Sequence, residues 1–270
     1  MIVFPKISLY NKKEFQYYAK GKGSAMIRLI LILIFVILFL IISLPIQFVE
    51  WIIKKYNPYA ADISSLRIVQ WAFKVILFIA GTKITVIGKE NIPKDTAVLY
   101  IPNHQSYFDI IITYSMCPGL TGYVSKDVLK KVPGLNIWMK RLYCLFLDRK
   151  DIKAGLKMVL TGIEQIKNGV SMCIFPEGTR NKHPENGMAP FKEGSMKMAE
   201  KSGCPVVPIA ISNTGEILEN HLPRVKKCHV IVQYGEPIYI KDLEKEQRKF
   251  LGAYTQKKIE EMLETHGDLL

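Results

Sequence analysis

A histidine and an aspartate five positions apart, His104 and Asp109, are the first residues in the chain whose types and spacing could support catalysis. Imidazole can hold or release a proton near neutral pH, and a carboxylate that accepts from one ring nitrogen leaves the other nitrogen free as a base. An odd spacing places two side chains on opposite faces of a strand, and on one helix these two would lie roughly 140° apart. They can therefore meet only if His104 lies on a loop and Asp109 lies in the first turn of a following helix.

The flanking sequence fits this arrangement. An apolar run at 97–101, ended by Pro102, predicts a buried strand before the histidine. Ser106 is a suitable N-cap, and residues 107–116 form a mostly apolar helical stretch. Taken alone, the pair also has a non-catalytic explanation, as a turn histidine and an aspartate that favours a helix N-terminus through the helix dipole.

A second apolar run, residues 172–175, is followed by a turn that could bind an anion. Proline and glycine predict a tight turn there, and glycine lets the backbone approach an anion closely. The turn presents an acid, exposed backbone, a hydroxyl and a guanidinium suited to phosphate, in the order Glu177, Gly178, Thr179 and Arg180. A plain β-turn with a solvated arginine explains the same residues.

Two further basic residues follow apolar runs. Arg149 ends the stretch Phe-Leu-Asp-Arg at 146–149, and Lys126 follows a predicted strand at 121–125. A surface ion pair between Asp148 and Arg149 explains the arginine, and a solvated side chain explains Lys126. They can contribute to one binding site only if the strands that precede them end at the same edge of one sheet.

The composition limits the kinds of partner. A net charge of +13 over 270 residues favours a polyanion, either a nucleic acid or an anionic membrane surface. The basic residues do not interleave with aromatic ones on a recognisable nucleic-acid module, which argues against nucleic acid. The five cysteines are widely spaced, so we expect reduced thiols on the cytosolic side. We expect no metal, because no His, Cys or Asp cluster has ligand spacing.

The N-terminal region predicts membrane association. Residues 29–46 are almost entirely apolar, near the minimum of about 17–25 residues for a membrane span, and no small-residue cleavage site follows them. Residues 66–80 are apolar but carry Arg67, Gln70 and Lys74 on one helical face, so they predict an interfacial helix or the return arm of a shallow hairpin. Basic residues flank the first run on both sides, and a re-entrant pair with both ends in the cytosol fits best.

From residue 83 onwards, short apolar runs alternate with amphipathic ones. This alternation predicts an α/β fold, a mixed, mostly parallel sheet covered by helices, preceded by a membrane-embedded helical hairpin. We divide the chain into membrane-associated helices at 1–80 and an α/β domain at 81–270. The predicted strands lie near 83–88, 97–102, 121–125, 143–148, 170–175, 205–211 and 228–234, and the predicted helices near 107–117, 126–140, 151–168, 192–202 and 241–265. Such sheets bind ligands at the carboxyl ends of their strands, where His104 would lie.

The order of the motifs resembles one family. Asn-His-x4-Asp at 103–109, Phe-Leu-Asp-Arg at 146–149, Phe-Pro-Glu-Gly-Thr-Arg at 175–180 and Val-Pro-Ile at 207–209 resemble the 1-acylglycerol-3-phosphate (lysophosphatidate) acyltransferases, over roughly residues 80–240. The apolar N-terminal helices also resemble those of bacterial members. One departure is Tyr143, which stands where the family usually has a glycine. If that glycine makes room for a substrate, acceptor or chain selectivity differs here.

The resemblance implies an O-acyltransferase that transfers an acyl chain from a thioester to the sn-2 hydroxyl of 1-acylglycerol 3-phosphate, giving phosphatidic acid. His104 would be the general base, and Asp109 would orient it and stabilise its charge. The turn at 177–180 would shape the acceptor site, and residues 206–209 would line the acyl side. The acceptor phosphate would be held by Arg180, Arg149 and Lys126.

The resemblance also implies the partners. These are lysophosphatidate, membrane lipids and an acyl donor, either acyl-coenzyme A or acyl carrier protein, with no bound cofactor and the active site on the cytoplasmic side of the membrane. Another lyso-acceptor, such as a lyso-aminolipid or a different lysophospholipid, and a non-catalytic membrane-binding protein are the alternatives. A serine hydrolase is disfavoured because neither Ser106 nor Ser125 lies in a Gly-x-Ser-x-Gly elbow.

Overall fold

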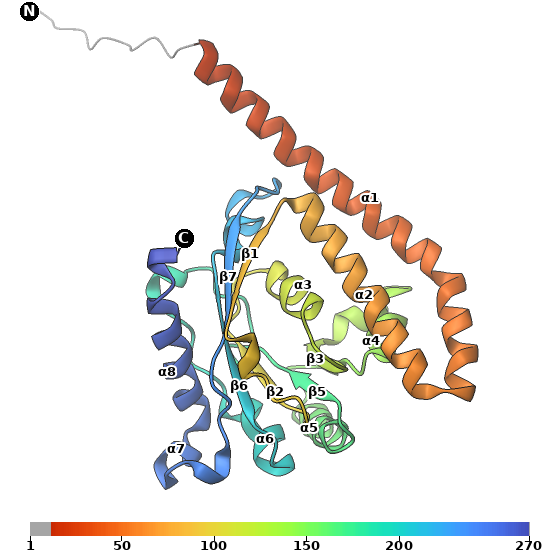
Figure 1. The fold of residues 1–270 in the computed structure, drawn as a ribbon, viewed down its shortest axis with the longest axis vertical. Coiled ribbons are helices and arrows are strands. Elements are labelled where there is room, and N and C mark those ends of the chain that lie inside the picture. The colour runs from red at the N-terminus through yellow and green to blue at the C-terminus, as the bar shows by residue number, and fades with distance from the viewer. Residues whose placement is uncertain (1–11, 270) are drawn as a thin grey trace, which may run out of the picture.

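A seven-stranded sheet forms the centre of the computed structural model, which describes residues 12–269. Its strand order is β1-β7-β6-β2-β5-β3-β4 (Figure 1). Neighbours from β6 to β4 run parallel, β7 runs antiparallel to β6, and β1 runs parallel to β7, so the prediction of a mixed, mostly parallel sheet is confirmed. The strands are β1 Lys83–Ile87, β2 Leu99–Pro102, β3 Thr121–Lys126, β4 Leu145–Leu147, β5 Ser171–Cys173, β6 Val206–Ser212 and β7 His229–Tyr234, one in each predicted region.

Helices cover both faces of the sheet, and β2 shows how the faces are divided. Tyr100 belongs to one buried cluster together with residues of α2, α3 and α4. Leu99 and Ile101, which point the other way along the strand, belong to a second cluster with residues of α5, α6 and α8. The helices are α1 Lys12–Tyr56, α2 Pro58–Ala80, α3 Tyr107–Ser115, α4 Leu135–Arg141, α5 Ile152–Lys167, α6 Lys197–Ser202, α7 Lys245–Lys249 and α8 Leu251–Glu264.

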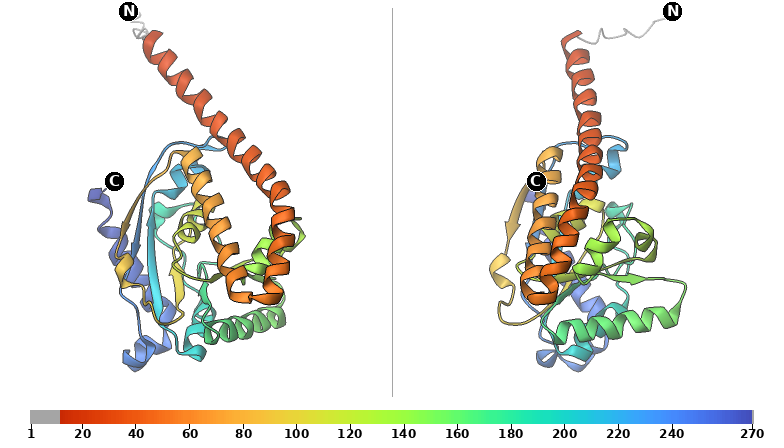
Figure 2. Two further views of the ribbon diagram at one scale, coloured as in Figure 1. Left: turned by 45° about the vertical axis from the view of Figure 1, so that its right-hand side comes forward. Right: turned by 90° about the vertical axis from the view of Figure 1, so that its right-hand side faces the viewer.

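The first two helices form an antiparallel hairpin that lies along one side of the sheet, with the N-terminal part of α1 projecting beyond it (Figures 1 and 2). Both helices are long and apolar enough to cross a membrane. The outer surface of α1 carries a continuous series of exposed apolar side chains, including Ile27, Ile30, Ile34, Ile37 and Ile41. An apolar surface of this kind marks contact with lipid or with another apolar partner.

The inner side of the hairpin is held to the sheet domain by polar contacts. Trp138 Nε1 on α4 donates to Ser43 Oγ on α1 at 3.0 Å. Gln70 Nε2 on α2 donates to the carbonyl oxygens of Tyr114 and Cys117 at the end of α3, at 3.2 and 2.8 Å. Gln70 therefore faces the protein, and its Oε1 accepts from Arg67 Nη1 at 2.8 Å, in agreement with the prediction that the two share one helical face.

Four predicted helices differ from the observed ones. The one predicted near 66–80 begins earlier, at Pro58, because Asn57 caps it through Ala60 N and Pro58 suits the first helical position. The prediction of one helix at 126–140 is wrong. Lys126 ends β3, a 3-10 turn spans Asp127–Lys131, and α4 starts only after Pro133 and Gly134, where Gly134 has a φ of +74°. The region 192–202 divides into a 3-10 turn and α6, and the region 241–265 into a 3-10 turn, α7 and α8.

Candidate active site

His104 lies on the loop after β2, and Asp109 lies in the first turn of α3. His104 Nδ1 and Asp109 Oδ2 are 2.8 Å apart, so the predicted contact between the two side chains is confirmed. Because a carboxylate can only accept, Nδ1 carries the proton and Nε2 is the basic nitrogen of the neutral ring. The histidine side chain is 13% exposed, whereas the aspartate side chain is fully buried.

Asp109 is held by more than the histidine. Its Oδ2 also accepts from the backbone N–H groups of Gln105 and Ser106, at 2.7 and 2.8 Å, and its Oδ1 accepts from Thr214 Oγ1 at 2.5 Å. The contact with Ser106 is half of a capping box, in which Ser106 Oγ accepts from Phe108 N. The carboxylate that orients the imidazole is thus the one that starts the helix.

The turn after β5 fixes the backbone of the histidine. Glu177 Oε1 accepts from His104 N at 2.7 Å, and Glu177 Oε2 accepts from Ala189 N at 3.2 Å. Burial raises the pKa of the Glu177 carboxyl, because removal from water disfavours the charged form. The Phe175 ring stacks on the imidazole with 4.1 Å between ring centroids. Glu177 therefore supports the histidine, and the role of the turn at 177–180 in shaping the acceptor site stays a prediction.

Lys192 and Arg180 give this turn its cationic character. Gly178 has a φ of +75°, a conformation that glycine adopts without a steric penalty. A β-carbon at this position would lie 2.7 Å from Lys192 Nζ, so a lysine ammonium group that the sequence motif does not contain lies against the turn. Thr179 is exposed, and the Arg180 guanidinium lies over the Tyr107 ring at 3.7 Å, close to the start of α3.

The sheet places the remaining predicted residues at the same edge but farther from the histidine. His104, the turn at 177–180, Lys126 and Arg149 follow or end the parallel neighbours β2, β5, β3 and β4, in that order across the sheet. At about 4.8 Å per strand, Lys126 lies about 10 Å and Arg149 about 14 Å along the edge from the end of β2. Both side chains are exposed, and among the described residues neither makes a hydrogen bond or ion pair with the His104 group.

Two residues after β6 complete the site and were not predicted. Thr214 donates to Asp109, as described above, and Glu219 accepts from Ser106 Oγ and Tyr107 N at 2.6 and 2.8 Å. Both contacts join segments more than a hundred residues apart, so no local motif could have revealed them. The only signal in the sequence is the predicted strand at 205–211, whose carboxyl end belongs to the same edge.

Tyr143, the departure from the family pattern, has a φ of +59°. This left-handed conformation suits glycine and costs other residues roughly 1–2 kcal/mol. The Tyr143 hydroxyl donates a hydrogen bond to Asp62 on α2, and Lys54 Nζ on α1 lies 2.8 Å from the other oxygen of that carboxylate. The tyrosine therefore links the N-terminal hairpin to the loop before β4.

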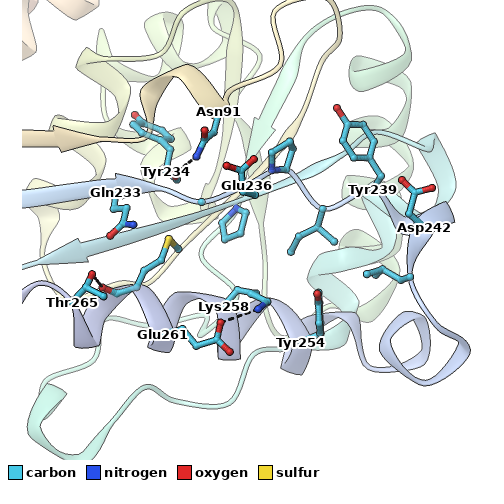
Figure 3. A pocket seen from close by; sticks show the side chains of 16 residues that line it. Asn91, Gln233, Tyr234, Glu236, Tyr239, Asp242, Tyr254, Lys258, Glu261 and Thr265 are labelled. Carbon is cyan, nitrogen blue, oxygen red and sulfur yellow. Dashed lines mark hydrogen bonds and ion pairs between the residues drawn. The ribbon is translucent and has the colours of Figure 1, made fainter.

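Cavities lie near the ends of the sheet. One of about 330 Å³ adjoins the histidine loop and is lined by Gln105, Glu177, Asn181 and, from α8, Leu263. Another, of about 560 Å³, is drawn in Figure 3 and lies between β7 and α8, with Tyr234, Glu236 and Tyr254 among its lining residues. Because β7 is antiparallel to β6, its carboxyl end lies at the edge opposite His104, so this second cavity does not adjoin the candidate site.

Comparisons with known proteins identify the family of this chain. A family model described as Acyltransferase matches residues 83–212. The 1-acyl-sn-glycerol-3-phosphate acyltransferase of Saccharomyces cerevisiae is 30% identical over 209 residues, covering 75% of this chain and 68% of the yeast protein. The protein of the same name from Borreliella burgdorferi is 31% identical over 194 residues, covering 71% and 76%. The chain belongs to the 1-acyl-sn-glycerol-3-phosphate acyltransferase family.

The family match runs from the start of β1 to the end of β6. It contains every predicted site residue, whereas Thr214 and Glu219 lie just beyond it. In fold, the chain is similar to the 1-acyl-sn-glycerophosphate (LPA) acyltransferase PlsC from Thermotoga maritima, with a TM-score of 0.77 and 23% identity, covering 91% of this chain and 98% of that one. This coverage exceeds what residues 83–270 alone can supply, so the likeness extends into the N-terminal hairpin.

Proposed function

We propose that this protein transfers an acyl chain from an acyl thioester to the sn-2 hydroxyl of 1-acylglycerol 3-phosphate, giving phosphatidic acid. The observation that carries the proposal is the contact between His104 Nδ1 and Asp109 Oδ2 at the carboxyl edge of the sheet. Membership of the 1-acyl-sn-glycerol-3-phosphate acyltransferase family supports the choice of acceptor.

In the proposed reaction, His104 Nε2 takes the proton from the acceptor hydroxyl while the hydroxyl oxygen attacks the thioester carbonyl carbon. The C–S bond then breaks, and the imidazolium returns the proton to the leaving thiolate. Asp109 stabilises the imidazolium while it exists. A positioned base of this kind typically contributes about 10²–10⁴-fold to the rate, and the attack is direct, without a covalent acyl-enzyme.

The acceptor phosphate is assigned to the cationic turn after β5. Arg180 lies beside the first turn of α3, which also holds Asp109, so a phosphate on the guanidinium keeps the glycerol hydroxyl near His104. Lys126 and Arg149 lie farther along the edge. They are assigned to the same phosphate, to which they add positive charge. Gly178 and Thr179 offer the backbone and hydroxyl of the turn to it.

The donor is assigned as an acyl thioester, either acyl-coenzyme A or acyl carrier protein. Both carriers are anionic, and the net charge of +13 favours the approach of either. Residues 206–209 are assigned to the acyl side.

The N-terminal hairpin is assigned to the membrane, where the lysolipid acceptor resides, with the active site on the cytoplasmic side. The exposed apolar surface of α1 supports this assignment. The division into membrane-associated residues 1–80 and an acyltransferase domain at 81–270 remains a prediction.

The test is an acyl-transfer assay on detergent-solubilised protein with a panel of lysolipid acceptors and both donor classes. We expect lysophosphatidate to be acylated and His104→Ala to abolish turnover. Acylation of another lysolipid but not of lysophosphatidate would refute the acceptor assignment. Activity that survives His104→Ala would refute the mechanism.

A further inference from the structure

Glu219 lies outside every motif yet touches two of them. It begins the 3-10 turn Glu219–His221 in the segment after β6. One carboxylate oxygen, Oε1, accepts from Tyr107 N at 2.8 Å and from Arg180 Nη1 at 3.1 Å, and Oε2 accepts from Ser106 Oγ at 2.6 Å. The Glu219 side chain is 17% exposed, so this pairing is shielded from solvent more than a surface ion pair is.

These contacts hold the Arg180 guanidinium from two directions. Glu219 Oε1 pairs with one end of it, and the Tyr107 ring supports its face at 3.7 Å. Arginine has a long side chain with substantial rotamer entropy, which is lost when the side chain binds a ligand. A guanidinium already fixed in place loses less on binding, so the pre-organised side chain binds the ligand more tightly.

We propose that Glu219 is a positioning residue for the acceptor, because it fixes Arg180 over the first turn of α3 and so sets where the acceptor phosphate lies relative to His104. This inference rests on the proposed function, in which Arg180 binds that phosphate. It assigns a role in substrate binding to the segment after β6, which the acyltransferase family match does not include.

The charge of Glu219 determines the direction in which the acceptor KM should change. A carboxylate beside a phosphate site repels the phosphate, so if Glu219 did nothing for Arg180, removal of its charge would strengthen acceptor binding. If Glu219 positions Arg180, removal of its charge weakens acceptor binding. The two effects on the acceptor KM have opposite directions.

Glu219→Gln separates the two roles of the side chain. The amide oxygen can still accept from Tyr107 N, and the amide group can still bond Ser106, but the ion pair with Arg180 is lost. We expect the KM for lysophosphatidate to rise about tenfold, with kcat and the KM for the acyl donor changed less than about twofold. Glu216→Gln is the matched control, since Glu216 pairs with Asn220 and His221 in the same segment. We expect it to leave all three parameters unchanged.

A double-mutant cycle tests whether Glu219 acts through Arg180. Arg180→Ala alone should raise the acceptor KM, and adding Glu219→Gln to it should raise the KM by less than about twofold more. A lower acceptor KM in Glu219→Gln, or an equal effect in both backgrounds, would overturn the inference. So would a loss of kcat that accompanies a lower melting temperature while KM stays constant.

The same experiment separates this inference from the function on which it rests. If Arg180→Ala leaves the acceptor KM unchanged while lysophosphatidate is still acylated, the positioning role is wrong and the acyltransferase assignment stands. If the unaltered protein does not acylate lysophosphatidate, both are wrong.

Discussion

Replacing Asp109 by asparagine removes one negative charge from the site with little change in shape. The amide oxygen can take the place of Oδ2, where it accepts from His104 Nδ1 and from the N–H groups of Gln105 and Ser106. The amide nitrogen then faces Thr214 Oγ1, which can turn to accept. The capping box therefore persists, and the variant should fold with α3 in place.

The substitution should raise the activation barrier of the acyl transfer. A hydrogen bond to a charged partner is worth about 1.5–3 kcal/mol, and here one partner is fully buried and the other 13% exposed, so solvent screens it little. That interaction is made in full only when the imidazole is protonated, in the transition state for attack. The barrier should rise by that amount, and kcat should fall about 10–150-fold.

The assay is steady-state acyl transfer, with the melting temperature in detergent as a check on folding. The matched control is Asp151→Asn, which removes the same charge from another helix N-terminus, where Asp151 caps α5 through Ala154 N. We expect the control to retain kcat within about twofold. An Asp109→Asn variant with the melting temperature and kcat of the unaltered protein would refute the reasoning.

Further predictions concern the supports of the site. Tyr143→Phe leaves an Asp62 oxygen without its donor, so the free energy of unfolding should fall by about 1–3 kcal/mol in chemical denaturation; an unchanged value would mean that the hairpin is not fastened there. Gly178→Ala and Gly203→Ala both force alanine to a positive φ, and each should lose about 1 kcal/mol of stability. Only Gly178→Ala, where the new methyl group meets a lysine side chain, should also raise the acceptor KM, and equal KM values would argue against a binding role for the turn. Burial raises the pKa of Glu177, so its contribution to stability is present at low pH and is lost as the pH rises through that raised value. Glu177→Gln should therefore gain stability relative to the unaltered protein between acidic and neutral pH, as measured by thermal unfolding, and a constant difference would contradict this.

The sequence was sufficient to place the strands, because each is a short apolar run bounded by turn residues. It also predicted the contact between His104 and Asp109, since two side chains at that spacing can meet only if one is on a loop and the other in the first turn of the next helix. It did not predict that β5 lies between β2 and β3, because strand order depends on packing between distant segments. The break at Pro133 and Gly134 was visible in the sequence, because proline and glycine both disfavour the interior of a helix. The prediction of one continuous helix was therefore wrong at these two residues.

The supports of the site were harder to predict. Glu219 bonds residues 112 and 39 positions away, and its own neighbourhood shows no pattern that distinguishes it from a solvated acid. The role of Glu177 as a brace for the His104 backbone also depends on where two loops meet. Motifs identify the side chains that can do chemistry, whereas the groups that orient them are revealed only by the fold.

The pairing of β1 with β7 affects how the molecule is made. Lys83 in β1 pairs with His229 in β7, and Val225 N donates to the carbonyl oxygen of Ala25 in α1. At roughly 5–20 residues per second, the 146 residues from 83 to 229 take a ribosome about 7–30 s to add. During that interval β1 exists without β7, its partner in the sheet. Under the proposed placement of the hairpin in the membrane, the nascent chain is anchored there before Thr214, the donor to Asp109, has been made.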